Sequence, residues 1–157
     1  MEEKRKDQER AVMKVLESNL KSIWDADVAA YRRTTAQDCS FFEWYISPQR
    51  IDGLDFHLRE IRVHRMVISG GADPLEEDEQ LFEHEILQPR VQIYGSCAIV
   101  TFTLMVRAVF PGKVVRKSHN ETRVFHNFGT EEEAEWKLVH CHKSPVATPE
   151  SMSVLRS

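Results

Sequence analysis

Hydrophobic positions near the N-terminus recur with the spacing of a helix. Between residues 2 and 24, apolar side chains fall on one stripe and charged side chains cover the remaining positions. The stripe consists of Val12, Leu16, Leu20, Ile23 and Trp24. We therefore predict a long amphipathic helix. Because residues 1–10 are almost all charged, we expect this end of the helix to fray.

The pattern then changes from helical to strand-like along the chain. Asp25 or Asp27 can cap a second, short helix over 28–34. An aromatic-rich strand at 39–46, a helix at 53–66 and a Gly- and acid-rich loop at 68–80 follow. The remaining strands are predicted over 81–94, 96–110, 114–127 and 135–143. Pro89 lies within the first of them and indicates a bulge or an edge strand.

This order of elements predicts an α+β domain with its helices gathered on one face of a curved, antiparallel sheet. The other face of such a sheet is exposed apolar surface unless a partner covers it. A chain of 157 residues suits one domain. We assign that domain to residues 1–145 and expect the Pro- and Ser-rich tail, 146–157, to be disordered.

Composition excludes several classes of protein. The chain is 41% hydrophobic and 29% charged, with a net charge of −4, which favours neither nucleic acid nor an anionic membrane as a partner. No apolar run approaches a membrane span, and the N-terminus lacks the apolar segment of a secretory signal. The three cysteines are scattered in apolar contexts, at Cys39, Cys97 and Cys141. We interpret them as reduced thiols in a cytoplasmic protein without a cofactor.

The last two strands carry charged and apolar side chains on the same face. Alternation places Glu121, Arg123 and Phe125 on one face of the first strand, opposite Thr122, Val124 and His126. In the second strand it groups Trp136, Leu138, His140 and His142 against Lys137, Val139, Cys141 and Lys143. We therefore predict a sheet with two occupied faces. One face lines a partly polar cavity, and the other packs against a neighbour such as another subunit.

Four motifs in the same order resemble a known family. They are the segment 53–57 (Gly-Leu-Asp-Phe-His), the segment 86–91 followed by Gly95, the segment 121–126 (Glu-Thr-Arg-Val-Phe-His), and Trp136 with the segment 139–144. Together they resemble the association (hub) domain of calcium/calmodulin-dependent protein kinase II, within the nuclear transport factor 2-like superfamily. The resemblance extends from about residue 9 to residue 145. It implies a cone in which the long N-terminal helix packs in a strongly curved antiparallel sheet.

The resemblance implies a self-association module that forms stacked rings of dimers, a dodecamer or larger. We expect a free-standing hub without its own kinase domain, whose partners are further copies of itself, kinase-type hub subunits or a peptide. The convex face of the sheet is expected to form the oligomer interface. The residues assigned to it are Trp136, Leu138, His140, His142, Thr122, Val124 and His126.

The resemblance also implies a polar cavity inside the cone. Its candidate residues are His57, Arg123, Lys143, Glu43 and Thr103. The family carries arginines where this chain has Thr103 and Lys143, and lysine lacks the bidentate fork of arginine. We expect Arg123, His57 and Lys143 to make the cavity mildly electropositive, with Glu43 neutralising part of that charge. Arg123 needs a carboxylate or main-chain acceptor, because an unpaired buried guanidinium is costly.

Two alternatives follow from the same residues. A small-molecule enzyme or binding protein of the isomerase or cyclase type could use the cavity, with a carboxylate of raised pKa removing a proton next to a carbonyl. However, Arg123 in the same cavity favours a charged, paired Glu43, so we assign no catalytic residue. His140 and His142 have the spacing for one metal ion. No third ligand is evident in the sequence, and we predict packing rather than a metal site.

Overall fold

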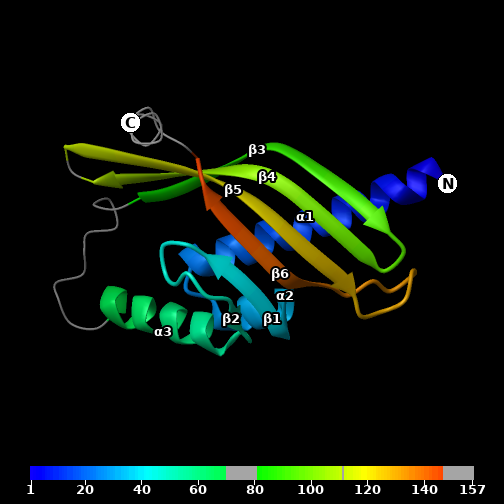
Figure 1. Ribbon diagram of the computed structural model, residues 1–157, viewed down its shortest axis with the longest axis horizontal. Coiled ribbons are helices and arrows are strands. Elements are labelled where there is room, and N and C mark those ends of the chain that lie inside the picture. The colour runs from blue at the N-terminus through cyan, green and yellow to red at the C-terminus, as the bar shows by residue number, and fades with distance from the viewer. Residues whose placement is uncertain (70–80, 111, 147–157) are drawn as a thin grey trace.

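The computed structural model describes residues 1–69, 81–110 and 112–146. Its elements, in chain order, are α1 (Glu2–Trp24), α2 (Val28–Thr34), β1 (Thr35–Glu43), β2 (Ile51–Asp52), α3 (Asp55–Ser69), β3 (Leu81–Tyr94), β4 (Cys97–Phe110), β5 (Lys113–Asn127) and β6 (Trp136–Pro145) (Figure 1). The α+β prediction is confirmed. Most of the predicted acid-rich loop, and the predicted tail from residue 147, lie outside the described residues.

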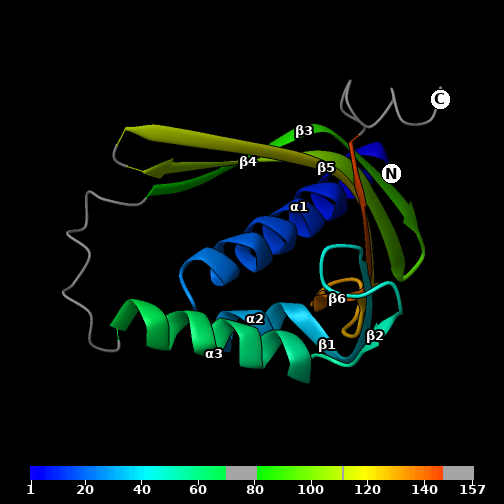
Figure 2. The same ribbon diagram turned by 60° about the vertical axis from the view of Figure 1, so that its left-hand side comes forward.

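The six strands form one strongly bent sheet in the order β2-β1-β6-β5-β4-β3. All neighbours pair antiparallel except β1 and β6, which are parallel, so the predicted purely antiparallel sheet is corrected at this position. Figure 2 shows α1, α2 and α3 together on the concave side of the sheet. Within the described ranges, no helix covers the convex face.

The helices form where the sequence predicts them. α1 buries Val12, Leu16 and Leu20 against the sheet, and it is already helical at Glu2, where we expect fraying. Asp27 caps α2, since its side chain accepts a hydrogen bond from the Ala30 N–H at 3.0 Å. In the part of the chain that is described, no helix is both long and apolar enough to span a membrane.

β3 shows why Pro89 is tolerated within a strand. β3 is an edge strand, and its pairing with β4 shifts register between Leu87 and Arg90. Gln88 takes a left-handed conformation there, with φ of +49°. Both features predicted from Pro89, an edge position and a bulge, are therefore confirmed.

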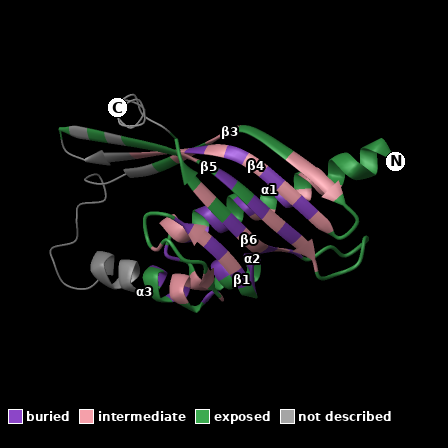
Figure 3. Cartoon of the chain, viewed as in Figure 1, coloured by how far each residue is buried: buried purple, intermediate pink, exposed green. Residues whose placement is uncertain are grey.

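The main core lies between α1 and the concave face of the sheet. β4 supplies alternate residues to it, and these are Ala98, Val100, Phe102 and Leu104. Figure 3 shows the same alternation as purple bands across the central strands. Successive residues of a strand point to opposite faces, so the residues between these four lie on the convex face.

A bulge in β6 corrects one prediction. Phe125 of β5 opposes Leu138, whereas Val124 opposes His140, so Val139 is an extra residue without an opposite partner. The side-chain alternation therefore reverses at this point. Trp136 and Leu138 are 4% and 1% exposed and belong to the core, whereas His140 lies on the convex face. The prediction that Trp136 and Leu138 share a face with His140 and His142 is wrong.

Candidate functional site

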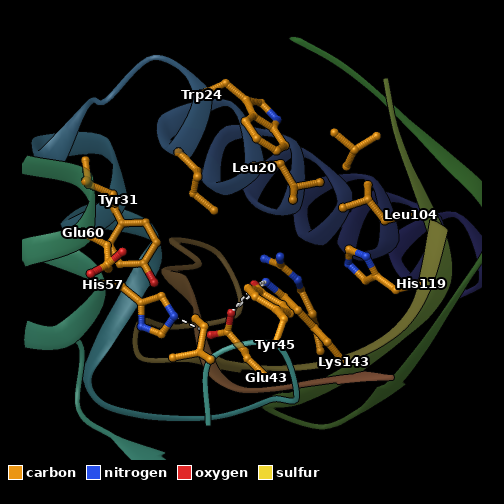
Figure 4. A pocket seen from close by; sticks show the side chains of 15 residues that line it. Leu20, Trp24, Tyr31, Glu43, Tyr45, His57, Glu60, Leu104, His119 and Lys143 are labelled. Atoms are coloured by element: carbon orange, nitrogen blue, oxygen red, sulfur yellow. Dashed lines mark hydrogen bonds and ion pairs between the residues drawn. The ribbon is translucent and has the colours of Figure 1, made fainter. Parts of the chain in front are cut away.

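The helices and the concave face of the sheet enclose a cavity of about 390 Å³ (Figure 4). One part of its wall is apolar and is formed by Leu20, Ile23, Ile61, Leu104 and Val106. Aromatic and charged side chains form the rest, among them Glu43, His57, Arg123 and Lys143. Four of the five predicted cavity residues therefore meet in one place, although they come from β1, α3, β5 and β6.

Glu43, at the end of β1, is a buried carboxylate with three partners. His57 of α3 contacts one carboxylate oxygen through Nε2, and the Tyr45 hydroxyl donates to the other. The Lys143 ammonium also donates to that second oxygen, at 3.2 Å. Burial alone would raise the pKa of Glu43, but the hydrogen bond from His57 and the charge of Lys143 outweigh it and lower the pKa to about 2. Glu43 is therefore firmly ionised.

Lys143 lies on β6, on the same side as the core, because the bulge at Val139 turns this part of the strand. Its Nζ also donates to the Tyr45 hydroxyl, at 3.1 Å. Burial would lower the pKa of Lys143, but the neighbouring acidic groups, Cys141 and Glu43 first, raise it above its usual value. Lys143 therefore carries its positive charge inside the protein.

Arg123 is 2% exposed and is held by two elements. Its Nε donates to Glu121 at 2.8 Å, and its Nη1 donates to the side-chain oxygen of Asn19 on α1 at 2.7 Å. Asn19 in turn donates to the hydroxyls of Thr34 and Thr35. The expected carboxylate partner is present. It is Glu121 rather than Glu43, which corrects the expected Arg123–Glu43 pairing.

Glu121 is a member of this buried network that the sequence reasoning did not assign to the cavity. Its other oxygen contacts Nε2 of His119 at 2.9 Å. Burial would raise the pKa of Glu121, but the charge of Arg123 lowers it well below its usual range. Strand alternation could have identified Glu121, because residues two apart on a strand share a face and Glu121 precedes Arg123 by two. Asn19 gave no such signal, since only the fold brings α1 against β5.

The chemistry of the cavity follows from these pairs. Glu43 is matched with Lys143, and Glu121 with Arg123, so each buried charge has an opposite charge beside it. A base that removes a proton next to a carbonyl works best with a pKa near the working pH. Glu43, with its lowered pKa, does not meet that requirement.

Thr103 is not brought to the cavity. Phe102 and Leu104 take the inward positions of β4, so Thr103 points to the convex face and donates to the Asn120 side chain at 2.8 Å. Thr103, which the resemblance placed in the cavity at the position of a family arginine, therefore belongs to the opposite surface.

The convex face carries the predicted histidine cluster. His140 Nδ1 lies 2.8 Å from the Ser40 hydroxyl, and the Phe42 ring contacts the rings of both His140 and His142. Burial, and then the neighbouring His142, lower the pKa of His140. Thr122, Val124 and His126 lie on the same face by strand alternation. Among the described side chains, no group of three or more is placed to hold a metal ion.

Comparison with known proteins identifies the fold and the family. The family model described as the calcium/calmodulin dependent protein kinase II association domain matches residues 8–147. The CaMKII hub of S. rosetta is 25% identical, with a TM-score of 0.66, over 87% of this chain and 95% of that chain. The CamKII hub homology domain of Chlamydamonas reinhardtii is 23% identical, with a TM-score of 0.71, over 87% and 96%.

A more distant structure has the same fold. An NTF2-like protein from Cytophaga hutchinsonii is 11% identical, with a TM-score of 0.65, over 88% of this chain and 98% of that chain. The predicted nuclear transport factor 2-like cone is therefore confirmed. The comparison with curated proteins gives no match.

Proposed function

The chain belongs to the association domain family of calcium/calmodulin-dependent protein kinase II, and from this premise we propose that it is a self-association hub whose convex sheet face packs against a second copy. Hub domains among its structural relatives support this role. The single observation that carries the proposal is the convex face itself, which no described helix covers.

The centre of the convex face has the composition of an interface core. The central strands β4 and β5 present Ile99, Thr101, Thr122 and Val124 there, with no charged side chain among them. Charged residues lie nearer its margins, at Arg90, Arg116 and Lys137. Interfaces lose charged residues at their centre and keep a polar rim. A continuous surface of this kind, left open in a single copy, fits a second copy of the same sheet.

Closing dimers into a ring requires a second kind of contact, between one dimer and the next. A contact that is not twofold closes into a ring only when its rotation divides the circle. We propose stacked rings of dimers, a dodecamer or larger, and any co-assembly with kinase-type hub subunits would use the same surfaces. Cys39 and Cys141 are buried free thiols, and they fit a cytoplasmic location with reduced cysteines.

A catalytic role for the cavity is the weaker alternative. The lowered pKa of Glu43 and the pairing of all four buried charges favour a structural network over an acid–base site. The hub proposal therefore assigns no catalytic residue.

Mass in solution tests the proposal. Native mass spectrometry at micromolar concentration should give a closed assembly of many copies. Thr122→Glu should reduce the mass to small species while the circular dichroism spectrum stays native, because Thr122 is exposed in the single copy. Ser18→Glu on the exposed side of α1 is the matched control and should keep the full mass. A wild-type monomer, or a Thr122→Glu protein of full mass, would contradict the proposal.

A further inference from the structure

The cavity has the size and wall of a small-molecule site. Its volume of about 390 Å³ lies near the lower end of the roughly 300–1,000 Å³ range of such sites. Much of the wall is apolar, with Leu20 and Ile23 from α1, Ile61 from α3, and Leu104 and Val106 from β4. This part of the wall would accommodate a compact apolar body.

The permanent charges buried at the polar part of the cavity are paired with one another. Glu43 and Glu121 contribute two negative charges, and Arg123 and Lys143 contribute two positive charges, so the formal charges cancel. Glu60 adds an exposed negative charge where it lines the cavity. A carboxylate ligand would therefore bring an uncompensated negative charge into a buried site, which is unfavourable.

A cationic ligand meets the opposite difficulty. Both oxygens of Glu43 are occupied, one by His57 and the other by Tyr45 and Lys143. Both oxygens of Glu121 are also occupied, one by Arg123 and the other by His119. An incoming ammonium group would therefore add a positive charge that no unpaired buried carboxylate is left to balance.

Hydrogen-bond donors remain available on the two cations. Arg123 uses Nε and Nη1, and within the described residues no group accepts from its Nη2. Lys143 has three N–H groups and uses two of them, toward Glu43 and Tyr45. Both residues line the cavity. Their remaining N–H groups suit an acceptor that carries no charge.

We propose that this cavity binds a compact neutral molecule, with its apolar body against the aliphatic wall and a carbonyl oxygen accepting from Arg123 Nη2 or Lys143 Nζ. The site discriminates against free carboxylates of the same shape. The proposal concerns the cavity alone and does not depend on assembly through the convex face.

Four probes of one shape test the class of ligand. 4-Phenylbutan-2-one is the neutral ketone, 3-phenylpropanoate the carboxylate, 4-phenylbutan-2-amine the cation and (3-methylbutyl)benzene the hydrocarbon. Isothermal titration calorimetry on the full chain should show the ketone binding at least about tenfold more tightly than the other three, because each of these leaves a charge or a donor unmatched. Equal or tighter binding of any of the other three, or no binding of the ketone, would overturn the proposal.

Two neighbouring substitutions locate the binding site. Val106→Phe fills the cavity and should abolish ketone binding, whereas Met105→Phe on the convex face should leave it unchanged. Circular dichroism establishes that both variants fold. If the Val106→Phe protein folds and binds the ketone as wild type does, the ligand lies elsewhere and the proposal fails.

Removing one buried negative charge should shift the preference toward the carboxylate. Glu43→Gln leaves the buried groups of the cavity with one uncompensated positive charge, so the ratio of carboxylate to ketone affinity should rise at least about tenfold. An unchanged ratio in a folded Glu43→Gln protein would show that charge balance does not set the selectivity. The wild-type probe series keeps the proposal testable if this variant does not fold.

Discussion

Arg123 shows how one residue ties α1 to the sheet. Its guanidinium is almost fully buried and joins Glu121 of β5 to Asn19 of α1. Burial would lower the pKa of Arg123, but Glu121 raises it above its usual value. The charge is therefore kept, and it is tolerated because the partner and the hydrogen bonds are complete.

Removing Arg123 should therefore cost much of the stability of the fold. We expect Arg123→Ala to lower the free energy of unfolding by about 3–5 kcal/mol, because Glu121 then stays buried without its cation. Urea unfolding followed by circular dichroism at pH 7 measures this loss. Arg59→Ala, on the exposed face of α3, is the control and should change the free energy by less than about 0.5 kcal/mol. Equal midpoints for the two variants would contradict the role of the ion pair.

Glu43 should make the stability depend on acid. Its pKa falls from the usual value of 4.5 to about 2 on folding. A lowered pKa stabilises the folded state above pH 4.5, and that contribution disappears as the pH falls toward 2. The shift corresponds to roughly 3 kcal/mol. The free energy of unfolding should fall less steeply between pH 5 and pH 2.5 in Glu43→Gln than in wild type, although Glu121 contributes in the same range. Parallel slopes would show that Glu43 has an ordinary pKa.

The cavity residues show what sequence reasoning can and cannot reach. Arg123 was predicted to need a carboxylate or main-chain acceptor, since burying an unpaired guanidinium is unfavourable in any fold. The pairing of Lys143 with Glu43 joins residues 100 positions apart, and strand alternation carries no information on such contacts. Thr103 was assigned by resemblance, although alternation with Phe102 and Leu104 already points it to the other face.

At the scale of elements, periodicity predicted the helices and long strands within a few residues. It failed where the chain departs from a regular period. The two-residue strand β2 is too short to produce a pattern. In β6, the extra residue Val139 reverses the alternation, and a bulge adds one residue without changing composition. As a result, the residues of β6 before Val139 point to the opposite face from the one that regular alternation predicts from His140.

The bulge gives a direct test of which face each residue occupies. Leu138→Ala should lower the free energy of unfolding by about 2–5 kcal/mol, because it leaves a cavity in the core. His142→Ala should change it by less than about 0.5 kcal/mol, since His142 is exposed in the single copy. Urea midpoints at low protein concentration compare the two. Similar losses for both variants would mean that Leu138 and His142 share a face after all.

At the scale of the whole molecule, the two faces of the sheet differ in what covers them and in the charges they carry. The concave face holds α1 and the cavity, with every buried charge paired. The convex face, proposed as the interface, carries its permanent charges near its margins and holds His126, His140 and His142 as well. Packing of like sheets across a twofold axis would bring the same face of two copies together, so both sides of the contact would carry His140. Protonation of His140 would then place like charges on both sides of one contact.

Mild acid should therefore loosen the assembly before it unfolds the protein. Burial and the neighbouring His142 lower the pKa of His140, so its neutral form is favoured, and this stabilisation is lost as the pH falls below the usual histidine pKa of about 6.5. The nearby carboxylate of Asp52 pairs with Arg50, so it does not offset the new charge. Light scattering from pH 7.5 to 5.5 should show falling mass, with a native circular dichroism spectrum. In the triple variant His126→Gln, His140→Gln, His142→Gln, the mass should stay nearly constant. The prediction fails if the wild-type mass is unchanged at pH 5.5, or if the triple variant dissociates in parallel with wild type. Either result would show that these histidines do not control the assembly contact.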